Sequence, residues 1–171
     1  MQYKSIYSSP LGEILLAGDE EAISGLWFTD ARYAGLGLPP DTPEGRTTAI
    51  LKAEEWLDVY FSGAEPDFLP RLLPAGSPFR QKVFRLLQQI PRGQTVTYGD
   101  LARVLGCASA QAIGGAVGHN EISIIIPCHR VVGTNGSLTG YAGGVDKKVK
   151  LLELEHADMR GFFVPKKGTA R

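Results

Sequence analysis

The segment that most constrains this chain is an apolar, β-branched run from Ile122 to Ile126, followed by a proline, a cysteine and a histidine. The run predicts a buried strand. Pro127 cannot donate a backbone hydrogen bond, so the strand should stop there and present Cys128 and His129 at its end.

Cys128 and His129 are a candidate nucleophile and base. Positive charge or hydrogen bonding stabilises the thiolate, which is the reactive form of cysteine. Neighbouring residues in a strand point to opposite sides, so the pair can cooperate only if the backbone turns after Pro127 or a water bridges them. The alternative is a structural cysteine beside a surface histidine, because free cysteine is among the most buried residue types.

The composition excludes several classes of protein. The 171 residues suit one large domain or two small ones, and the only cysteines, Cys107 and Cys128, lie outside any Cys/His cluster, which argues against a disulfide framework or a zinc site. No signal peptide is apparent, and no apolar run approaches the roughly 18 residues of a membrane span. We expect a cytoplasmic monomer without cofactor, metal or membrane association.

Charge is distributed unevenly along the chain. Residues 1–75 carry five Lys/Arg against twelve Asp/Glu, a net −7, whereas residues 76–171 carry thirteen against six, a net +7. Such a split favours a polyanion, most commonly nucleic acid, as the partner of the C-terminal half. The alternative is the ordinary fluctuation of charge between the halves of a protein.

The first half reads as a small α+β module. Residues 3–8, 13–18 and 22–28 predict strands, with a turn at Ser9-Pro10-Leu11-Gly12. A helical pattern follows from Thr48 to Phe61. Prolines and glycines between Asp67 and Pro78 place a domain boundary near residue 75.

The second half predicts helices. The first begins at Pro78, behind a Ser77 cap, and the second runs from about Tyr98 to Leu105 behind a Thr97–Asp100 capping box. The third, Ala110 to Val117, is capped by Ser109, so that two short helices follow the helix-turn-helix plan. A last helix spans Asp146 to His156, before a basic tail that contains Lys166, Lys167 and Arg171.

The third helix is built almost entirely of small residues. Gly114 and Gly115 each cost nearly 1 kcal/mol relative to alanine, so close approach should select them. The helix either packs tightly on the core or lets a DNA backbone come near. Gln111 is its chief long polar side chain, which argues against sequence-specific reading of bases.

These segments together resemble the 6-O-alkylguanine-DNA alkyltransferases, the methylated-DNA–protein-cysteine methyltransferases. The resemblance covers nearly the whole chain and is strongest between Phe79 and Glu155. It rests on Pro127-Cys128-His129-Arg130-Val131-Val132, the Gly-Gly-Ala helix with Asn120, and the Tyr141-x-Gly-Gly loop. It implies an α+β fold with an RNase H-like sheet-and-helix domain at residues 1–75, followed by a mainly helical, winged helix-turn-helix domain at residues 76–171.

The resemblance also implies a chemistry and its residues. Cys128 takes the alkyl group from the guanine 6-oxygen after base flipping and is not regenerated, with 4-O-alkylthymine left open as a second substrate. His129 deprotonates the thiol through a water, Glu155 orients His129, and Asn120 braces the turn. Tyr98 helps to rotate the nucleotide outward and donates a proton to the leaving guanine.

The implied partner is double-stranded DNA that contains alkylated bases. The DNA-contacting residues would be Tyr98, Ser109, Ala110, Gln111, Gly114, Gly115 and Thr134, and the pocket would be lined by Val131, Tyr141 and Ala142. Gln111 stands where most of the family has an arginine, which predicts weaker binding or slower repair. The first half has no Cys or His, so the structural zinc of some relatives cannot form there.

Three alternatives remain open. The first is a non-catalytic protein that recognises alkylated DNA, although such relatives typically lack the acceptor cysteine. The second is a winged-helix regulator, which the shortage of base-reading side chains opposes. The third is a thiol hydrolase, for which no oxyanion hole is apparent.

Overall fold

The computed structural model describes residues 1–106 and 109–165. Cys107 and the predicted basic tail, with Lys166, Lys167 and Arg171, lie outside the described residues. The chain divides into two compact units, the first formed by residues 1–75 together with 121–123 and the second by the remaining described residues.

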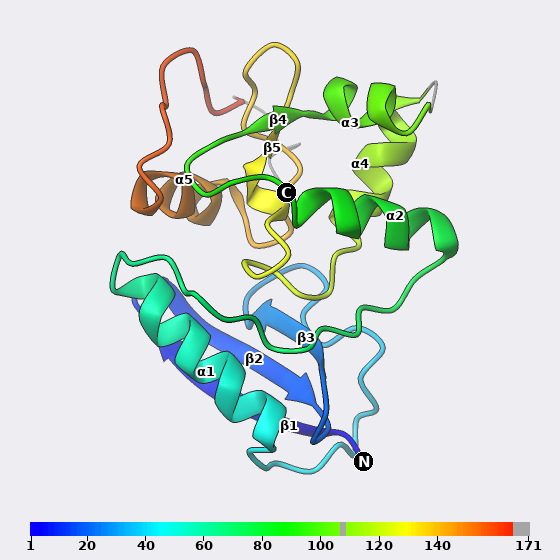
Figure 1. Cartoon of the computed structure of the whole chain (residues 1–171), viewed down its shortest axis with the longest axis vertical. Coiled ribbons are helices and arrows are strands. Elements are labelled where there is room, and N and C mark those ends of the chain that lie inside the picture. The colour runs from blue at the N-terminus through cyan, green and yellow to red at the C-terminus, as the bar shows by residue number, and fades with distance from the viewer. Residues whose placement is uncertain (107–108, 166–171) are drawn as a thin grey trace. The chain divides into compact units, whose positions relative to one another are not determined.

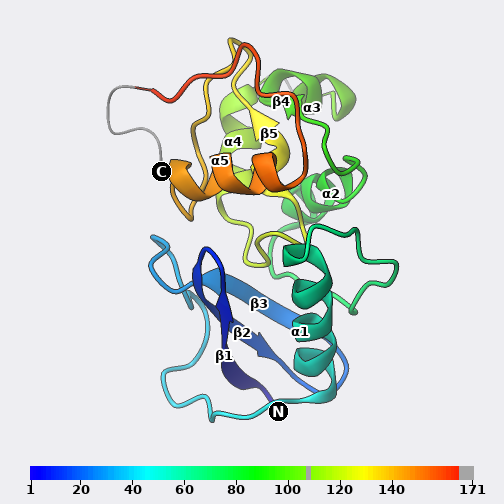
Figure 2. The ribbon, with the colours of Figure 1, turned by 90° about the vertical axis from the view of Figure 1, so that its left-hand side faces the viewer.

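The first unit is a three-stranded antiparallel sheet with one helix. Its strands β1 (Tyr3–Ser9), β2 (Gly12–Gly18) and β3 (Ile23–Phe28) pair in sequence order. At the predicted turn between β1 and β2, Ser9 Oγ accepts from Leu11 N at 3.1 Å and donates to Gly12 O at 2.6 Å. Helix α1 (Thr48–Phe61) lies along one face of the sheet (Figure 2), where Tyr7 Oη donates to Asp58 Oδ1 at 2.6 Å.

The second unit is mainly helical (Figure 1). Its elements are α2 (Pro78–Leu87), β4 (Val96–Thr97), α3 (Tyr98–Val104), α4 (Ala110–Gly118), the 3₁₀ turn η1 (Cys128–Arg130), β5 (Val131–Val132) and α5 (Val145–Leu154). Strands β4 and β5 pair in parallel, and α4 packs on both α2 and α3.

The predicted helix caps of this unit are present. The hydroxyl groups of Ser77 and Ser109 accept from the backbones of Arg80 and Ala112. Thr97 Oγ1 accepts from Asp100 N at 3.0 Å while Asp100 Oδ2 accepts from Thr97 N at 2.9 Å, which is the complete capping box. These side chains satisfy backbone donors that helix ends leave unpaired.

The strand predicted from Ile122 to Ile126 is wrong. Only Ile122 forms a bridge, parallel to Leu26 of β3, with hydrogen bonds from Leu26 N to Glu121 O and from Ser123 N to Leu26 O. The chain then turns, with Ile124 at φ +71°. All four isoleucines are nonetheless buried. An apolar run indicates burial, but it does not distinguish a strand from a buried turn. Residues 121–123 thus join the first unit, whereas the sequence placed them in the second domain.

In the parts of the chain that the structure describes, no helix combines the length and the apolar character that crossing a membrane requires.

Candidate active site

The backbone turns at the cysteine. Pro127 precedes η1, in which Arg130 N donates to Pro127 O at 3.0 Å, so Cys128 and His129 lie in a 3₁₀ turn rather than in a strand. Asn120 Nδ2 donates to Ile126 O at 2.8 Å and so holds the segment just before the turn. The objection that adjacent strand residues point apart therefore does not apply to Cys128 and His129.

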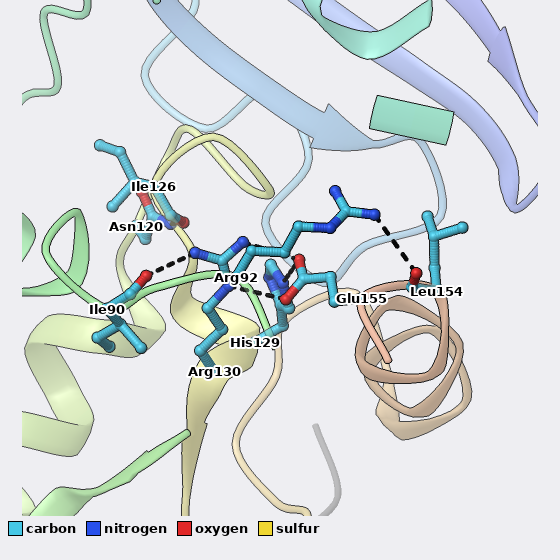
Figure 3. Close-up of polar contacts among 8 residues, drawn as sticks. All are labelled: Ile90, Arg92, Asn120, Ile126, His129, Arg130, Leu154 and Glu155. Carbon is cyan, nitrogen blue, oxygen red and sulfur yellow. Dashed lines mark hydrogen bonds and ion pairs between the residues drawn. The ribbon is translucent and has the colours of Figure 1, made fainter. Parts of the chain in front are cut away.

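His129 and Glu155 form a fully buried pair. His129 Nε2 lies 2.7 Å from Glu155 Oε2, and both side chains have an exposed fraction of 0% (Figure 3). Glu155 caps α5 directly after the last helical residue, Leu154. A carboxylate can only accept, so it fixes the hydrogen of His129 on Nε2 and leaves the lone pair on Nδ1. Nδ1 is buried and has no hydrogen-bond partner among the described residues.

The pKa values of this pair follow from burial and from the neighbouring charges. Burial lowers the pKa of His129, against the raising effect of Glu155, and the positive charges of Arg130 and Lys148 lower it further. Burial by itself would raise the pKa of Glu155, but the hydrogen bonds from His129 and Arg130 hold that pKa well below its usual range. The resting pair is thus a neutral imidazole beside an ionised carboxylate.

Cys128 is also buried, and burial raises the pKa of its thiol. A hydrogen bond from the Asn120 side chain and the positive charge of Lys148 act in the opposite direction. The thiol is therefore protonated at rest, and its conversion to a nucleophile needs a base. The unpartnered Nδ1 of the adjacent His129 suits that task.

Tyr98 and Tyr141 lie near this centre. Tyr98 Oη donates to Thr139 O at 3.2 Å, and burial, together with the charge of a Cys128 thiolate, raises the pKa of Tyr98 to about 12. The ring of Tyr141 meets that of His129 edge to face, with 6.3 Å between centroids. Val131 and Tyr141 are buried, while Ala142 is half-buried.

The predicted DNA-contacting residues differ in exposure. Ser109, Ala110, Gln111, Gly115 and Thr134 are exposed, whereas Tyr98 and Gly114 are half-buried. A Cβ built on Gly115 would meet no atom within 4 Å, and one on Gly114 would meet only Tyr98 Cε1, at 4.0 Å. Packing within the protein thus does not require glycine at either position, which removes the core-packing explanation offered above.

Two charged residues of the site were missed by the sequence reasoning. Lys148, in α5, is fully buried, and its Nζ donates to Val131 O at 2.6 Å and to Thr139 O at 2.9 Å. Arg130 contacts Glu155 through Nε at 2.8 Å and Nη2 at 3.0 Å. Lys148 falls on the apolar stripe of its helix with Leu151 and Leu152, and a lysine on such a stripe is a signal that the sequence does contain.

Within residues 1–106 and 109–165, no three Cys, His, Asp or Glu side chains are grouped in a way that could hold a metal ion.

Comparison with known proteins identifies the family. Residues 2–72 match the ribonuclease-like domain of 6-O-methylguanine DNA methyltransferase, and residues 78–157 match its DNA-binding domain. The chain is 42% identical to a methylated-DNA–protein-cysteine methyltransferase of Methanosarcina acetivorans, over 90% of this chain and 97% of that protein. It is 39% identical to the same protein of Mycobacterium tuberculosis H37Rv, over 91% and 92% of the two chains.

Solved structures agree with the sequence relatives. The crystal structure of Mycobacterium tuberculosis OGT in complex with DNA has 37% identity and a TM-score of 0.81, and the match covers 90% of this chain and 92% of that one. A Methanococcus jannaschii O6-methylguanine DNA methyltransferase has 30% identity and a TM-score of 0.61, covering 96% and 100%. The predicted α+β fold, with a ribonuclease-like domain before a DNA-binding domain, is thereby confirmed. This chain belongs to the 6-O-methylguanine DNA methyltransferase family.

Proposed function

We propose that this protein repairs alkylated DNA by transferring the alkyl group from the 6-oxygen of alkylguanine to Sγ of Cys128, once per molecule. The observation that carries the proposal is the buried His129, whose Nε2 is held by Glu155 and whose Nδ1 has no partner among the described residues. The names of the relatives, and the DNA complex of the Mycobacterium tuberculosis protein, support the same reaction.

The reaction begins with a proton transfer. The Cys128 proton passes through one water to His129 Nδ1, and Glu155 stabilises the imidazolium that forms. Sγ attacks the alkyl carbon, so that a carbon–sulfur bond forms as the bond to the guanine oxygen breaks. Tyr98 remains protonated at neutral pH, because its pKa is about 12, and donates a proton to the leaving guanine. His129 then gives up the thiol proton to water, Tyr98 regains a proton from solvent, and the stable thioether ends the activity of that molecule.

The substrate base must leave the duplex to reach Cys128. Flipping a base costs a few kcal/mol, and a damaged pair lowers that cost. Val131, Tyr141 and Ala142 would line the pocket that receives it, and Tyr98 would crowd the phosphate and favour rotation of the nucleotide.

The DNA-binding half would act as a winged helix-turn-helix with α4 as its recognition helix. The small, exposed residues Ala110 and Gly115 would allow close approach to the minor groove, and Ser109, Gln111 and Thr134 would add polar contacts. Such contacts depend little on sequence, which suits a protein that must find damage anywhere.

The test is the intact mass of the protein after incubation with a duplex that carries one 6-O-methylguanine. We expect a gain of one methylene unit on the Cys128 peptide, saturating at one equivalent, and no gain with undamaged DNA or with Cys128→Ser. An unchanged mass together with preferential binding of the damaged duplex would instead make the protein a non-catalytic recognition module.

A further inference from the structure

Arg130 forms hydrogen bonds to both oxygens of the buried Glu155 carboxylate, which orients His129. Its Nε lies 2.8 Å from Glu155 Oε1 and its Nη2 lies 3.0 Å from Oε2, which also accepts from His129 Nε2 (Figure 3). The third nitrogen, Nη1, donates to Ile90 O at 2.7 Å. One nitrogen of the guanidinium is thus held by the Ile90 carbonyl, while the other two donate to the carboxylate. This planar, two-pronged contact, or fork, is available to arginine and not to lysine.

The charge state of Glu155 decides which nitrogen of His129 carries hydrogen. An ionised carboxylate accepts from Nε2–H and leaves Nδ1 as an acceptor. A protonated carboxyl would donate to Nε2, and the neutral imidazole would then carry its hydrogen on Nδ1, the nitrogen that must accept the thiol proton. A carboxylate with 0% exposure ionises only when it is paired, because isolated burial strongly favours its neutral form.

The other charged groups around His129 cannot replace Arg130. Lys148 donates to two backbone carbonyls, Cys128 and Tyr98 are neutral at rest, and Tyr141 presents its ring edge-on. Arg130 contacts both oxygens of the carboxylate, Oε1 through Nε and Oε2 through Nη2.

We propose that Arg130 is a positioning residue of the alkyl-transfer reaction: its fork on Glu155, anchored on the Ile90 carbonyl, keeps the carboxylate ionised and thereby holds His129 as the tautomer with a free Nδ1. The proposal rests on the proposed function, in which Nδ1 receives the thiol proton.

The pH profile of transfer separates this role from a merely structural one. In Arg130→Met, Glu155 becomes easier to protonate, and the pKa of His129 rises because a neighbouring positive charge is gone. Both changes disable the base at low pH. We expect the ratio of the variant's rate constant to that of the wild type to be about tenfold or more lower at pH 6 than at pH 9. Because Cys128 titrates in both proteins, its contribution to the pH dependence cancels in the ratio of the two rate constants.

Two further variants sharpen the test. Arg130→Lys keeps the charge but loses the fork, so its ratio should fall between those of Arg130→Met and the wild type. Arg160→Met is the matched control, because Arg160 pairs with Asp158 at an exposed position of the same unit. Its profile should be that of the wild type. A reduction of equal size at every pH in Arg130→Met, or no reduction, would overturn the proposal.

Nitrogen-15 NMR of the histidine rings gives a readout that does not depend on activity. We expect His129 to carry hydrogen on Nε2 in the wild type at pH 7, and to shift toward the Nδ1-protonated or doubly protonated form in Arg130→Met and Arg130→Lys. If the wild type failed to transfer a methyl group, the proposed function would fall while this measurement still decided the role of Arg130. An unchanged tautomer in both variants would contradict that role.

Discussion

At the scale of single residues, the site depends on buried charges that are held by specific partners. Lys148 is one such charge, because its ammonium group joins α5 to β5 and to the loop at Thr139 through hydrogen bonds to two backbone carbonyls. Burial lowers its pKa to about 8, although a Cys128 thiolate would raise it. Burying this charge costs free energy and so reduces the stability of the second unit.

Lys148 makes stability depend on pH. Its pKa is lower in the folded state than the ordinary 10.5, so between about pH 8 and 10.5 the unfolded chain binds the proton that the folded chain has lost. Stability contributed by this group therefore rises with pH across that window and is constant below it. From pH 7.5 to 9.5, the free energy of unfolding of the wild type should rise by roughly 2 kcal/mol relative to Lys148→Met.

Chemical denaturation at each pH measures this difference. At pH 7, Lys148→Met leaves the buried carbonyl of Val131 without its donor, which costs about 1–3 kcal/mol. The matched control is Lys150→Met, on an exposed position of the same helix, whose curve should run parallel to that of the wild type. Parallel curves for Lys148→Met and the wild type would show that the amine stays protonated in the folded state.

The residues of the site were predictable to different degrees. Cys128 and His129 stand together behind a proline, so their chemistry is visible in the sequence. Glu155 lies 26 residues further along, and only the family resemblance linked it to His129; the structure gives a 2.7 Å contact. Arg130 lies within the motif, but its role is not visible in the sequence, because its two partners, Ile90 and Glu155, are brought to it by the fold.

At the scale of elements, helices were predicted better than the central strand. Helix caps and periodic apolar positions are local, and α1, α3 and α4 begin where those signals place them. The run at 122–126 was misassigned because burial, which it encodes, is compatible with either a strand or a turn. A β-branched residue at positive φ, such as Ile124, is held there by its surroundings at a cost of order 1–2 kcal/mol.

Helix α4 allows stability and DNA binding to be separated. Open space surrounds the position of a Cβ on Gly115, so Gly115→Ala should raise the free energy of unfolding by about 1 kcal/mol through helix propensity. If the DNA backbone approaches this exposed face, the same methyl group should weaken binding to a duplex. Denaturation and fluorescence anisotropy measure the two effects on one protein. A stabilised variant with unchanged affinity would place the DNA elsewhere.

At the scale of the whole molecule, charge is divided between the two halves of the sequence. Residues 76–171 carry a net +7 and residues 1–75 a net −7. The chain nonetheless does not divide at a single point, since residues 121–123 leave the second unit and add a bridge to β3 of the first. A three-residue insertion of this kind has no compositional signal, because Ile122 would be buried in either unit.

Because residues 76–171 carry the excess of positive charge, a further positive charge placed there should strengthen DNA binding. Gln111→Arg, on the exposed start of α4, should bind a duplex more tightly and repair it faster, and the slope of log K against log salt should steepen by about 0.9 for one added phosphate contact. Glu55→Gln makes the same change of one unit in net charge at an exposed position of α1. Because α1 belongs to the ribonuclease-like domain and not to the DNA-binding domain, that control should leave the slope unchanged. Equal effects of the two variants would mean that total charge, rather than a contact from α4, governs affinity.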